Sequence, residues 1–140
     1  QIRELLAIYT YYWNSKDVDG ILSIMCDECE IVHGEPWKGV YKGKNQMRRF
    51  FENILEKAPL NNKHHITNIV VRIDGEAKNA RATAYFFRVS SVEKEGKDVG
   101  VIATGWYTFD LEKVNEDWKL KRMKIDRCFQ SDEFRVTHFL

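Results

Sequence analysis

The chain has 140 residues, of which 44% are hydrophobic and 31% charged, and its formal net charge at pH 7 is +1. This length and balance suit one globular domain, residues 1–140, with a substantial buried core, and they argue against disorder. The near-neutral charge gives no reason to expect nucleic acid or a membrane surface as a partner, and no apolar run approaches the roughly 20 residues of a membrane-spanning helix.

The first part of the chain has the periodicity of helices. Apolar residues at offsets of three, four and seven predict an amphipathic first helix. They are Ile2, Leu5, Leu6, Tyr9, Tyr12 and Trp13. Asp17 is a suitable N-cap for a short second helix that includes Met25. A third helix is predicted from Gly43 to just before Pro59, with an apolar stripe at Met47, Phe50, Phe51, Ile54 and Leu55.

The segment between the second and third helices reads as short extended pieces. Residues 30–33 predict a strand, and residues 40–41 a second short one. Gly34 and Gly39 mark turns around Trp37.

From residue 64 onwards the hydrophobic period changes to two, which predicts strands. We expect four of them, at 64–73, 80–91, 98–112 and 118–129. Asp74-Gly75 and the loop around Gly96 are hairpin signals. Helices followed by hairpin-linked strands indicate an α+β fold rather than alternating βαβ units.

Two strands depart from simple alternation. The strand at 98–112 is apolar on both faces, with Tyr107 and Phe109 on one and Ile102 and Trp106 on the other. A sheet that is wet on one side alternates more cleanly, so we expect a partner subunit on the outer face, in a homo-oligomer that is a dimer or a trimer. In the last strand the apolar phase shifts after Leu120, which predicts a bulge.

Four ordered segments resemble the SnoaL-like families of the nuclear-transport-factor-two-like superfamily. They are residues 13–19, the Gly39-x-Tyr41-x-Gly43 turn, the strand that opens at His64, and residues 105–118. The resemblance implies a cystatin-like α+β cone barrel, in which three N-terminal helices pack on a curved, mostly antiparallel sheet around an internal pocket. The patterns lie nearest to those of scytalone dehydratase and bile acid 7α-dehydratase.

The resemblance also implies functional residues. His64 matches the pocket histidine that acts as a base in these enzymes, and Tyr9 matches a tyrosine that polarises a substrate oxygen. Asn14 stands where the enzymes carry an aspartate that orients the histidine. Arg127 falls near an arginine at the pocket mouth, and the second polar position, where relatives carry His or Asp, falls near Arg88 to Ser91.

Each of these residues also has a structural interpretation. A neutral imidazole can accept a proton at physiological pH, but His64 could equally be an ordinary polar residue at a strand start. His65 points to the opposite face and should be a bystander. Asn14 could fix the tautomer of the imidazole or simply end a helix, and Tyr9 could serve only as core.

The remaining candidates concern substrate binding. Pocket-wall positions are expected at Trp13, Tyr12, Phe86, Trp106 and Tyr107. Arg127 could hold a substrate carboxylate in a bidentate contact or form a surface ion pair.

No cofactor is predicted, because the sequence has no phosphate-binding or dinucleotide-binding fingerprint. Cys26 and Cys29 follow a helix, which does not suit a redox pair, and zinc would need both His33 and Cys128 as further ligands. We therefore expect buried thiols and no metal. Three cysteines cannot form a disulfide framework, which favours a cytoplasmic location.

These observations favour a cofactor-independent lyase or isomerase that removes a proton with His64. Its substrate would be a hydrophobic small molecule, and a polycyclic compound is one option. The alternative is a non-catalytic ligand-binding or dimerising subunit of the same fold, including a partner of the ring-hydroxylating dioxygenase β type. The loss of the acid at Asn14 supports that alternative.

Overall fold

The computed structural model describes residues 1–34, 38–59 and 61–135, with side chains up to residue 131. The turn expected around Trp37 falls outside the described residues. Within them, no helix is long and apolar enough to cross a membrane.

Three helices form where the apolar stripes predict them: α1 (Ile2–Asn14), α2 (Val18–Ser23) and α3 (Gly43–Lys57). Asp17 caps α2 by accepting a hydrogen bond from the backbone N–H of Gly20 at 2.8 Å. The prediction for Met25 was wrong. It begins a strand instead of ending α2, because its side chain is needed in the core opposite Leu120.

The six strands are longer than the sequence pattern indicated. They are β1 (Met25–His33), β2 (Gly39–Lys42), β3 (Lys63–Ile73), β4 (Asn79–Lys94), β5 (Lys97–Val114) and β6 (Asp117–Arg135). They form one sheet in the order β2-β1-β6-β5-β4-β3, in which only β1 and β6 pair in parallel.

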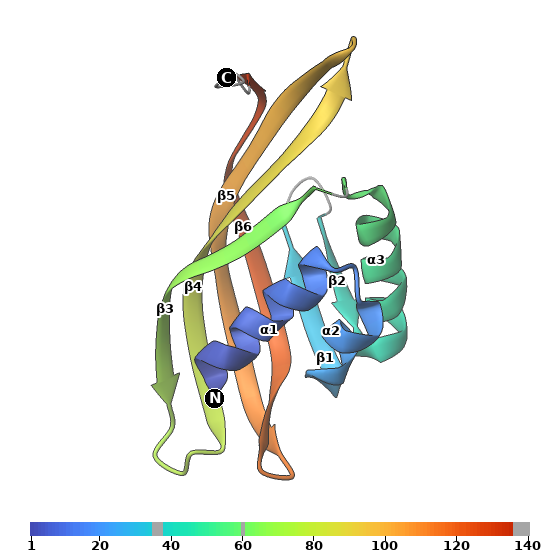
Figure 1. Cartoon of the computed structure of the whole chain (residues 1–140). Coiled ribbons are helices and arrows are strands. Elements are labelled where there is room, and N and C mark those ends of the chain that lie inside the picture. Colours follow the sequence, from blue (N-terminus) through green and yellow to red (C-terminus); the bar gives the residue numbers. More distant parts are fainter. Residues whose placement is uncertain (35–37, 60, 136–140) are drawn as a thin grey trace.

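The sheet is curved, mixed and not closed, and all three helices cover its concave face (Figure 1). Helix α1 contacts the edge strand β3, whereas α3 contacts β1 and β2 at the other side. The far ends of β4, β5 and β6 extend beyond the helices (Figure 1). This is the α+β cone architecture that the sequence predicted.

Irregular pairing bends the strands around the helices. The expected bulge in β6 is confirmed, because the register shifts between the Asp110 and Leu111 pairs and leaves Lys121 as the extra residue. A second shift lies beside Gly105, and a third lies in β3 near Asn68, which has φ 53°. Bulges increase twist and bend a strand, so these positions give the sheet its concave face.

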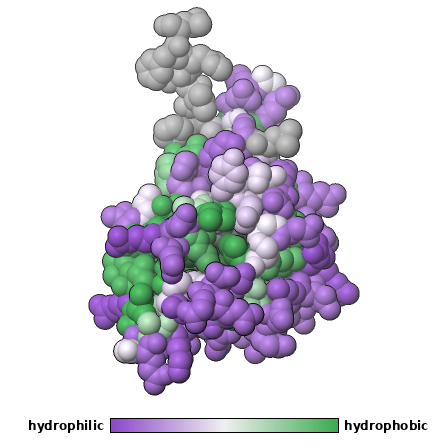
Figure 2. All heavy atoms as spheres, turned by 60° about the horizontal axis from the view of Figure 1, so that its bottom comes forward, coloured by the Kyte–Doolittle hydropathy of each residue, from purple (hydrophilic) through white to green (hydrophobic). Residues whose placement is uncertain are grey.

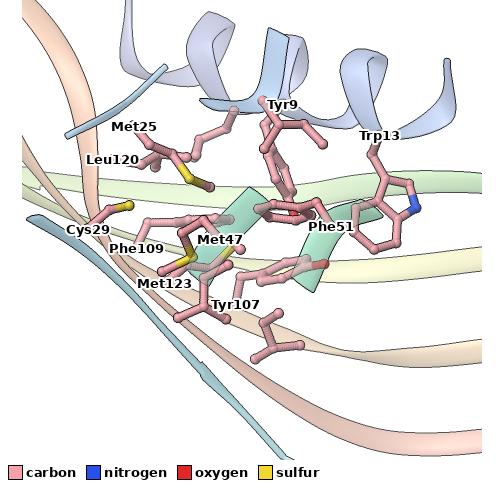
Figure 3. Close-up of a cluster of buried hydrophobic side chains, with 14 of the residues drawn as sticks. Tyr9, Trp13, Met25, Cys29, Met47, Phe51, Tyr107, Phe109, Leu120 and Met123 are labelled. Atoms are coloured by element: carbon pink, nitrogen blue, oxygen red, sulfur yellow. The ribbon is translucent and has the colours of Figure 1, made fainter. Parts of the chain in front are cut away.

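The core fills the space between α1, α3 and the concave face. Its largest fully buried side chains include Tyr9, Tyr107, Phe51 and Phe109. Figure 3 shows Tyr9 descending from α1 towards Tyr107, with Met47 and Phe51 beside them. Ring centroids of Tyr9 lie 6.3 Å from Tyr107 and 6.4 Å from Phe109, both in edge-on geometry.

Apolar side chains at the surface include a group near the start of α1 and a group on the convex face of the sheet. At the end of the molecule where α1 begins, apolar atoms show between polar ones (Figure 2). Leu5, Ile8 and Trp118 belong to the lining of a shallow hollow beside the start of α1. On the convex face of the sheet, an aromatic patch formed by Tyr85, Phe87, Trp106 and Phe129 is 40–59% exposed.

Candidate functional site

A small cavity of about 30 Å³ opens on the concave face, between the helices and the middle of the sheet. That volume suits a water molecule or a group of a few atoms rather than a polycyclic skeleton. Its described lining is Trp13, His33, Phe50, Ile54, His64, Phe86, Arg88, Ala103, Tyr107, Ile125 and Arg127.

His64 lies at the centre of this lining and is buried. Its ring Nε2 is 2.8 Å from the hydroxyl of Tyr107, which comes from β5. The rings of Trp13 and Phe86 each lie 5.3 Å from the imidazole, centroid to centroid. The imidazole is therefore held by one hydrogen bond inside an aromatic box.

The second ring nitrogen of His64, Nδ1, is buried and has no hydrogen-bond partner among the described residues. If Nε2 carries the proton and donates it to Tyr107, Nδ1 keeps a basic lone pair. If Tyr107 donates to Nε2, Nδ1 carries an N–H that needs an acceptor. In either tautomer, Nδ1 has bonding capacity that a substrate can use.

Burial controls the ionisation of the pair. Desolvation, with the positive charge of Arg88 as a further cause, lowers the pKa of His64 to about 3. Desolvation likewise raises the pKa of Tyr107 well above its usual value. Both groups are neutral at pH 7, so the site offers an uncharged imidazole and an uncharged phenol.

Asn14 holds the backbone of His64 rather than its ring. Its Nδ2 donates to the His64 carbonyl at 3.1 Å, and its Oδ1 accepts from the His64 N–H at 2.7 Å. Because β3 is an edge strand, this amide takes the place of a further strand at that position. An amide supplies one donor and one acceptor, which a carboxylate cannot do.

Tyr9 is fully buried and lies outside the cavity lining. Its hydroxyl makes no hydrogen bond of ordinary geometry among the described residues. Desolvation raises the pKa of Tyr9, and a weaker side-chain hydrogen-bonding interaction with Tyr107 lowers it in part. Tyr9 therefore packs against Tyr107 in the core and does not itself line the cavity.

Two arginines and a second histidine belong to the described lining of the cavity. Arg88 of β4 stands opposite His64 in the strand register, and Arg127 of β6 stands opposite Gly105. His33 of β1 adds a second imidazole, whose Nδ1 lies 2.6 Å from the carbonyl of Gly34. No Asp or Glu belongs to the described lining.

The cavity brings together some of the sequence-predicted residues and not others. His64, Trp13, Phe86, Tyr107 and Arg127 line it, as expected. Trp106 does not, because it lies on the convex face, where its indole N–H donates to Asp126 at 3.1 Å. Tyr12 packs beside Gly20 of α2 instead of facing the cavity.

Sequence reasoning missed two lining residues. His33 was considered only as a metal ligand, and Arg88 only as a departure from the related enzymes. The available signal was the strand phase, since Arg88 lies on the same face of its strand as the buried Phe86, and His33 on the same face as the buried Ile31. Among the described residues, no group of three or more His, Cys, Asp or Glu side chains is arranged to hold a metal.

The architecture and the enclosed imidazole define a cystatin-like α+β protein with a pocket in the concave face of its sheet. The model of the SnoaL-like domain matches residues 1–124, so the chain belongs to the SnoaL-like domain family. No curated protein shows a significant match.

Solved structures with similar folds share little sequence with this chain. The chain is similar to the hexachlorocyclohexane dehydrochlorinase LinA-type3 from Novosphingobium barchaimii LL02, with 17% identity, a TM-score of 0.81, and coverage of 99% of this chain and 91% of that one. A scytalone-dehydratase-like protein from Novosphingobium aromaticivorans DSM 12444 is 18% identical, with a TM-score of 0.79 and coverage of 99% of this chain and 93% of that one. A cystatin-fold protein of unknown function from Nostoc punctiforme PCC 73102 is 20% identical, with a TM-score of 0.74 and coverage of 91% of this chain and 88% of that one.

Proposed function

We propose that this protein is a cofactor-independent lyase or isomerase that removes a proton from a small substrate with the imidazole of His64. The observation that carries the proposal is the buried His64–Tyr107 pair in the lining of a cavity, with Nδ1 of His64 unbonded among the described residues. Relatives of the fold named as a dehydrochlorinase and a scytalone-dehydratase-like protein support a lyase-type reaction.

In the proposed reaction, the Nδ1 lone pair takes a proton from a carbon next to a carbonyl or a leaving group. The electron pair of the broken C–H bond forms a C=C bond, either as the leaving group departs with the bonding electrons or as the carbonyl becomes an enolate, while the proton stays on His64. Tyr107 accepts the hydrogen bond from Nε2–H and keeps the imidazole in the required tautomer. The buried indole N–H of Trp13, unpartnered among the described residues, is available to donate to the substrate oxygen.

The cavity volume narrows the substrate. A space of about 30 Å³ admits the reacting end of a molecule, so a polycyclic substrate would require the walls to move. We therefore favour a small carbonyl or hydroxy compound. In this mechanism Tyr9 packs against the ring of Tyr107 and helps to hold it in place. Asn14 fixes the position of His64 by hydrogen bonds to its backbone.

Hydrogen–deuterium exchange tests the proposal without knowledge of the final product. A panel of small ketones and hydroxy acids is incubated with the protein in D₂O, and exchange at carbon is followed by NMR. We expect exchange with at least one member of the panel and a loss of about 100-fold or more in His64→Ala. His65→Ala, which changes an exposed neighbour on the opposite face, should keep the wild-type rate.

If the folded wild-type protein exchanges no member of the panel, or if His64→Ala exchanges as fast, the proposal fails. A non-catalytic ligand-binding subunit is then the better interpretation. The observations that favour it are the small cavity and the use of Asn14 on the backbone.

The aromatic patch on the convex face supports a homo-oligomer. Four aromatic side chains that are about half exposed leave roughly 400 Å² of ring surface in water, against about 800 Å² buried per partner in a typical interface. Flanking charges are paired within the chain, as Arg81 with Asp110 and Lys124 with Asp126, so two copies can meet without strong repulsion. Light scattering should show an oligomer that Trp106→Lys dissociates and that Tyr11→Lys, an exposed change on α1, leaves intact.

A further inference from the structure

We propose that the cavity has a binding site for one neutral oxygen atom, between the indole N–H of Trp13 and Nδ1 of His64. A water molecule occupies this site in the resting protein, and the hydroxyl of a small uncharged substrate replaces it. The inference rests on the proposed function, because it names the substrate class of the same site: hydroxy carbonyl compounds that lose their hydroxyl as water.

Two polar atoms of the residues that line the cavity point to a bound molecule. The indole N–H of Trp13 and Nδ1 of His64 are buried and have no hydrogen-bond partner among the described residues. The two residues are only 7% and 5% exposed, so bulk water does not reach them freely. Buried polar groups in native proteins are almost always bonded to protein or to ordered water. One donor and one acceptor in the same lining therefore favour an occupant that bonds to both.

The fold brings these two side chains together from different elements. Trp13 lies at the end of α1 and His64 near the start of β3, and their rings meet edge to face with centroids 5.3 Å apart. The hydrogen bonds of Asn14 to the His64 backbone hold the helix end and the strand in this position. Figure 3 shows the Tyr107 hydroxyl and the indole nitrogen of Trp13 directed towards the same side of the core, and on that side the hydroxyl meets His64.

A water molecule or a hydroxyl group matches the size and the bonding of this site. A volume of about 30 Å³ accommodates one water molecule. Its oxygen accepts from the indole N–H of Trp13, and one of its hydrogens bonds to the lone pair on Nδ1 of His64. A hydroxyl makes the same two bonds, whereas a carbonyl oxygen only accepts and an ammonium group only donates. Desolvation keeps His64 neutral at pH 7, so the lone pair is available.

This site holds the leaving group of the proposed reaction. The substrate hydroxyl accepts from Trp13, and Nδ1 of His64 takes the proton from the neighbouring carbon. The C–H electron pair forms the C=C bond, and the C–O bond breaks with both its electrons on oxygen. The oxygen takes the proton from Nδ1 and leaves as water, so His64 returns to its neutral form. The indole N–H stabilises the negative charge that develops on the oxygen.

Trp13→Phe tests the site, because it removes the N–H and keeps an aromatic ring in the wall. A crystal structure of the wild type, at a resolution that shows ordered water, should contain a water molecule within hydrogen-bonding distance of both atoms. Trp13→Phe should lose this water. Trp118→Phe is the matched control at a buried tryptophan outside the described lining, and it should keep the water.

Isopropanol and acetone test the preference for a hydroxyl, with binding followed by NMR shifts of the His64 ring. Acetone displaces the water but cannot donate to Nδ1, so isopropanol should bind at least about fivefold more tightly. Trp13→Phe should weaken isopropanol binding at least about fivefold, and Trp118→Phe should not change it.

A wild-type cavity without the bridging water, equal binding of the two probes, or undiminished isopropanol binding in Trp13→Phe would overturn the inference. If Trp13→Phe does not fold, the wild-type crystal structure and the two probes decide the matter. The two proposals fail separately. Carbon exchange by a wild type that holds no bridging water leaves the lyase standing and removes the oxygen site, whereas a bridging water without carbon exchange does the reverse.

Discussion

Neighbouring residues on opposite faces of the sheet have very different surroundings in this protein. Tyr107 is 2% exposed and bonded to His64, while Trp106 is 45% exposed and bonded to Asp126. In β3, His64 is buried beside the cavity and His65 is exposed. Residue type is similar within each pair, so the pleat of the strand, and not the chemistry of the side chain, determines which residue belongs to the site.

The largest expected difference between the two faces concerns pH. The folded-state pKa of His64, about 3, lies below the usual histidine value of 6.5, so the unfolded chain binds more protons between these two pH values. The free energy of unfolding should therefore fall as the pH is lowered from about 6.5 towards 3, by up to about 5 kcal/mol from this residue. Urea unfolding of wild type and His64→Gln at several pH values measures this contribution of His64 to the free energy of unfolding.

His65→Gln is the matched control for that experiment, because its side chain is exposed in the folded protein. It should leave the pH dependence unchanged. An equal pH dependence in wild type and His64→Gln would mean that His64 is not buried in its neutral form.

A second expected difference concerns aromatic packing. Phe109 is fully buried on the concave face, so Phe109→Ala should lower the free energy of unfolding by about 3–5 kcal/mol. Tyr85 is 59% exposed on the convex face, so Tyr85→Ala should lower the free energy of unfolding by less than about 1 kcal/mol. Denaturant unfolding at a concentration where the protein is monomeric compares the two, and similar losses would contradict the assignment of the faces.

Asn14 provides a smaller test of how the concave face is assembled. Asn14→Ala removes both bonds to the His64 backbone and should cost about 1–3 kcal/mol. Asn14→Asp keeps an acceptor for the His64 N–H but places a carboxylate oxygen next to the His64 carbonyl oxygen, so this variant should also be less stable than wild type. Thermal unfolding checks both variants; an Asn14→Asp protein that is as stable as wild type would show that the amide is not required.

The smallest expected effect on stability comes from the hydroxyl of Tyr107. Tyr107→Phe removes its hydrogen bond to His64 and should cost about 1–2 kcal/mol, while it reduces carbon exchange because the tautomer is no longer fixed. Tyr85→Phe removes a hydroxyl from the convex face and should change neither property. A Tyr107→Phe variant with wild-type exchange would exclude a positioning role for the hydroxyl.

The sequence carried enough information for the fold and for part of the site. Apolar periodicity located all three helices, the N-cap at Asp17 and the bulge after Leu120, because each depends on local spacing. The resemblance pointed to His64. The strand phase puts Trp106 on the face opposite Tyr107, so the expectation that Trp106 lines the pocket was at odds with the sequence pattern itself.

The contacts of Asn14 and Arg88 depend on a different kind of information. Asn14 meets His64 only because α1 lies against the edge strand β3, a contact between residues 50 positions apart. Arg88 reaches the cavity because the register of β3, β4 and β5 aligns it with His64 and Ala103. The strand phase gives the face on which each residue lies, but which residues of neighbouring strands stand opposite one another also depends on turns and bulges, which the hydrophobic pattern leaves open.

The most direct test of the account is the protonation state of His64 measured by NMR of its ring nitrogens. We predict a neutral ring from pH 8 down to about pH 4, with Nε2 as the protonated nitrogen, and a change of its shifts in Tyr107→Phe but not in Tyr85→Phe. A ring that titrates with a midpoint near 6.5, or that does not respond to Tyr107→Phe, would contradict a buried, neutral His64–Tyr107 pair as the centre of the site.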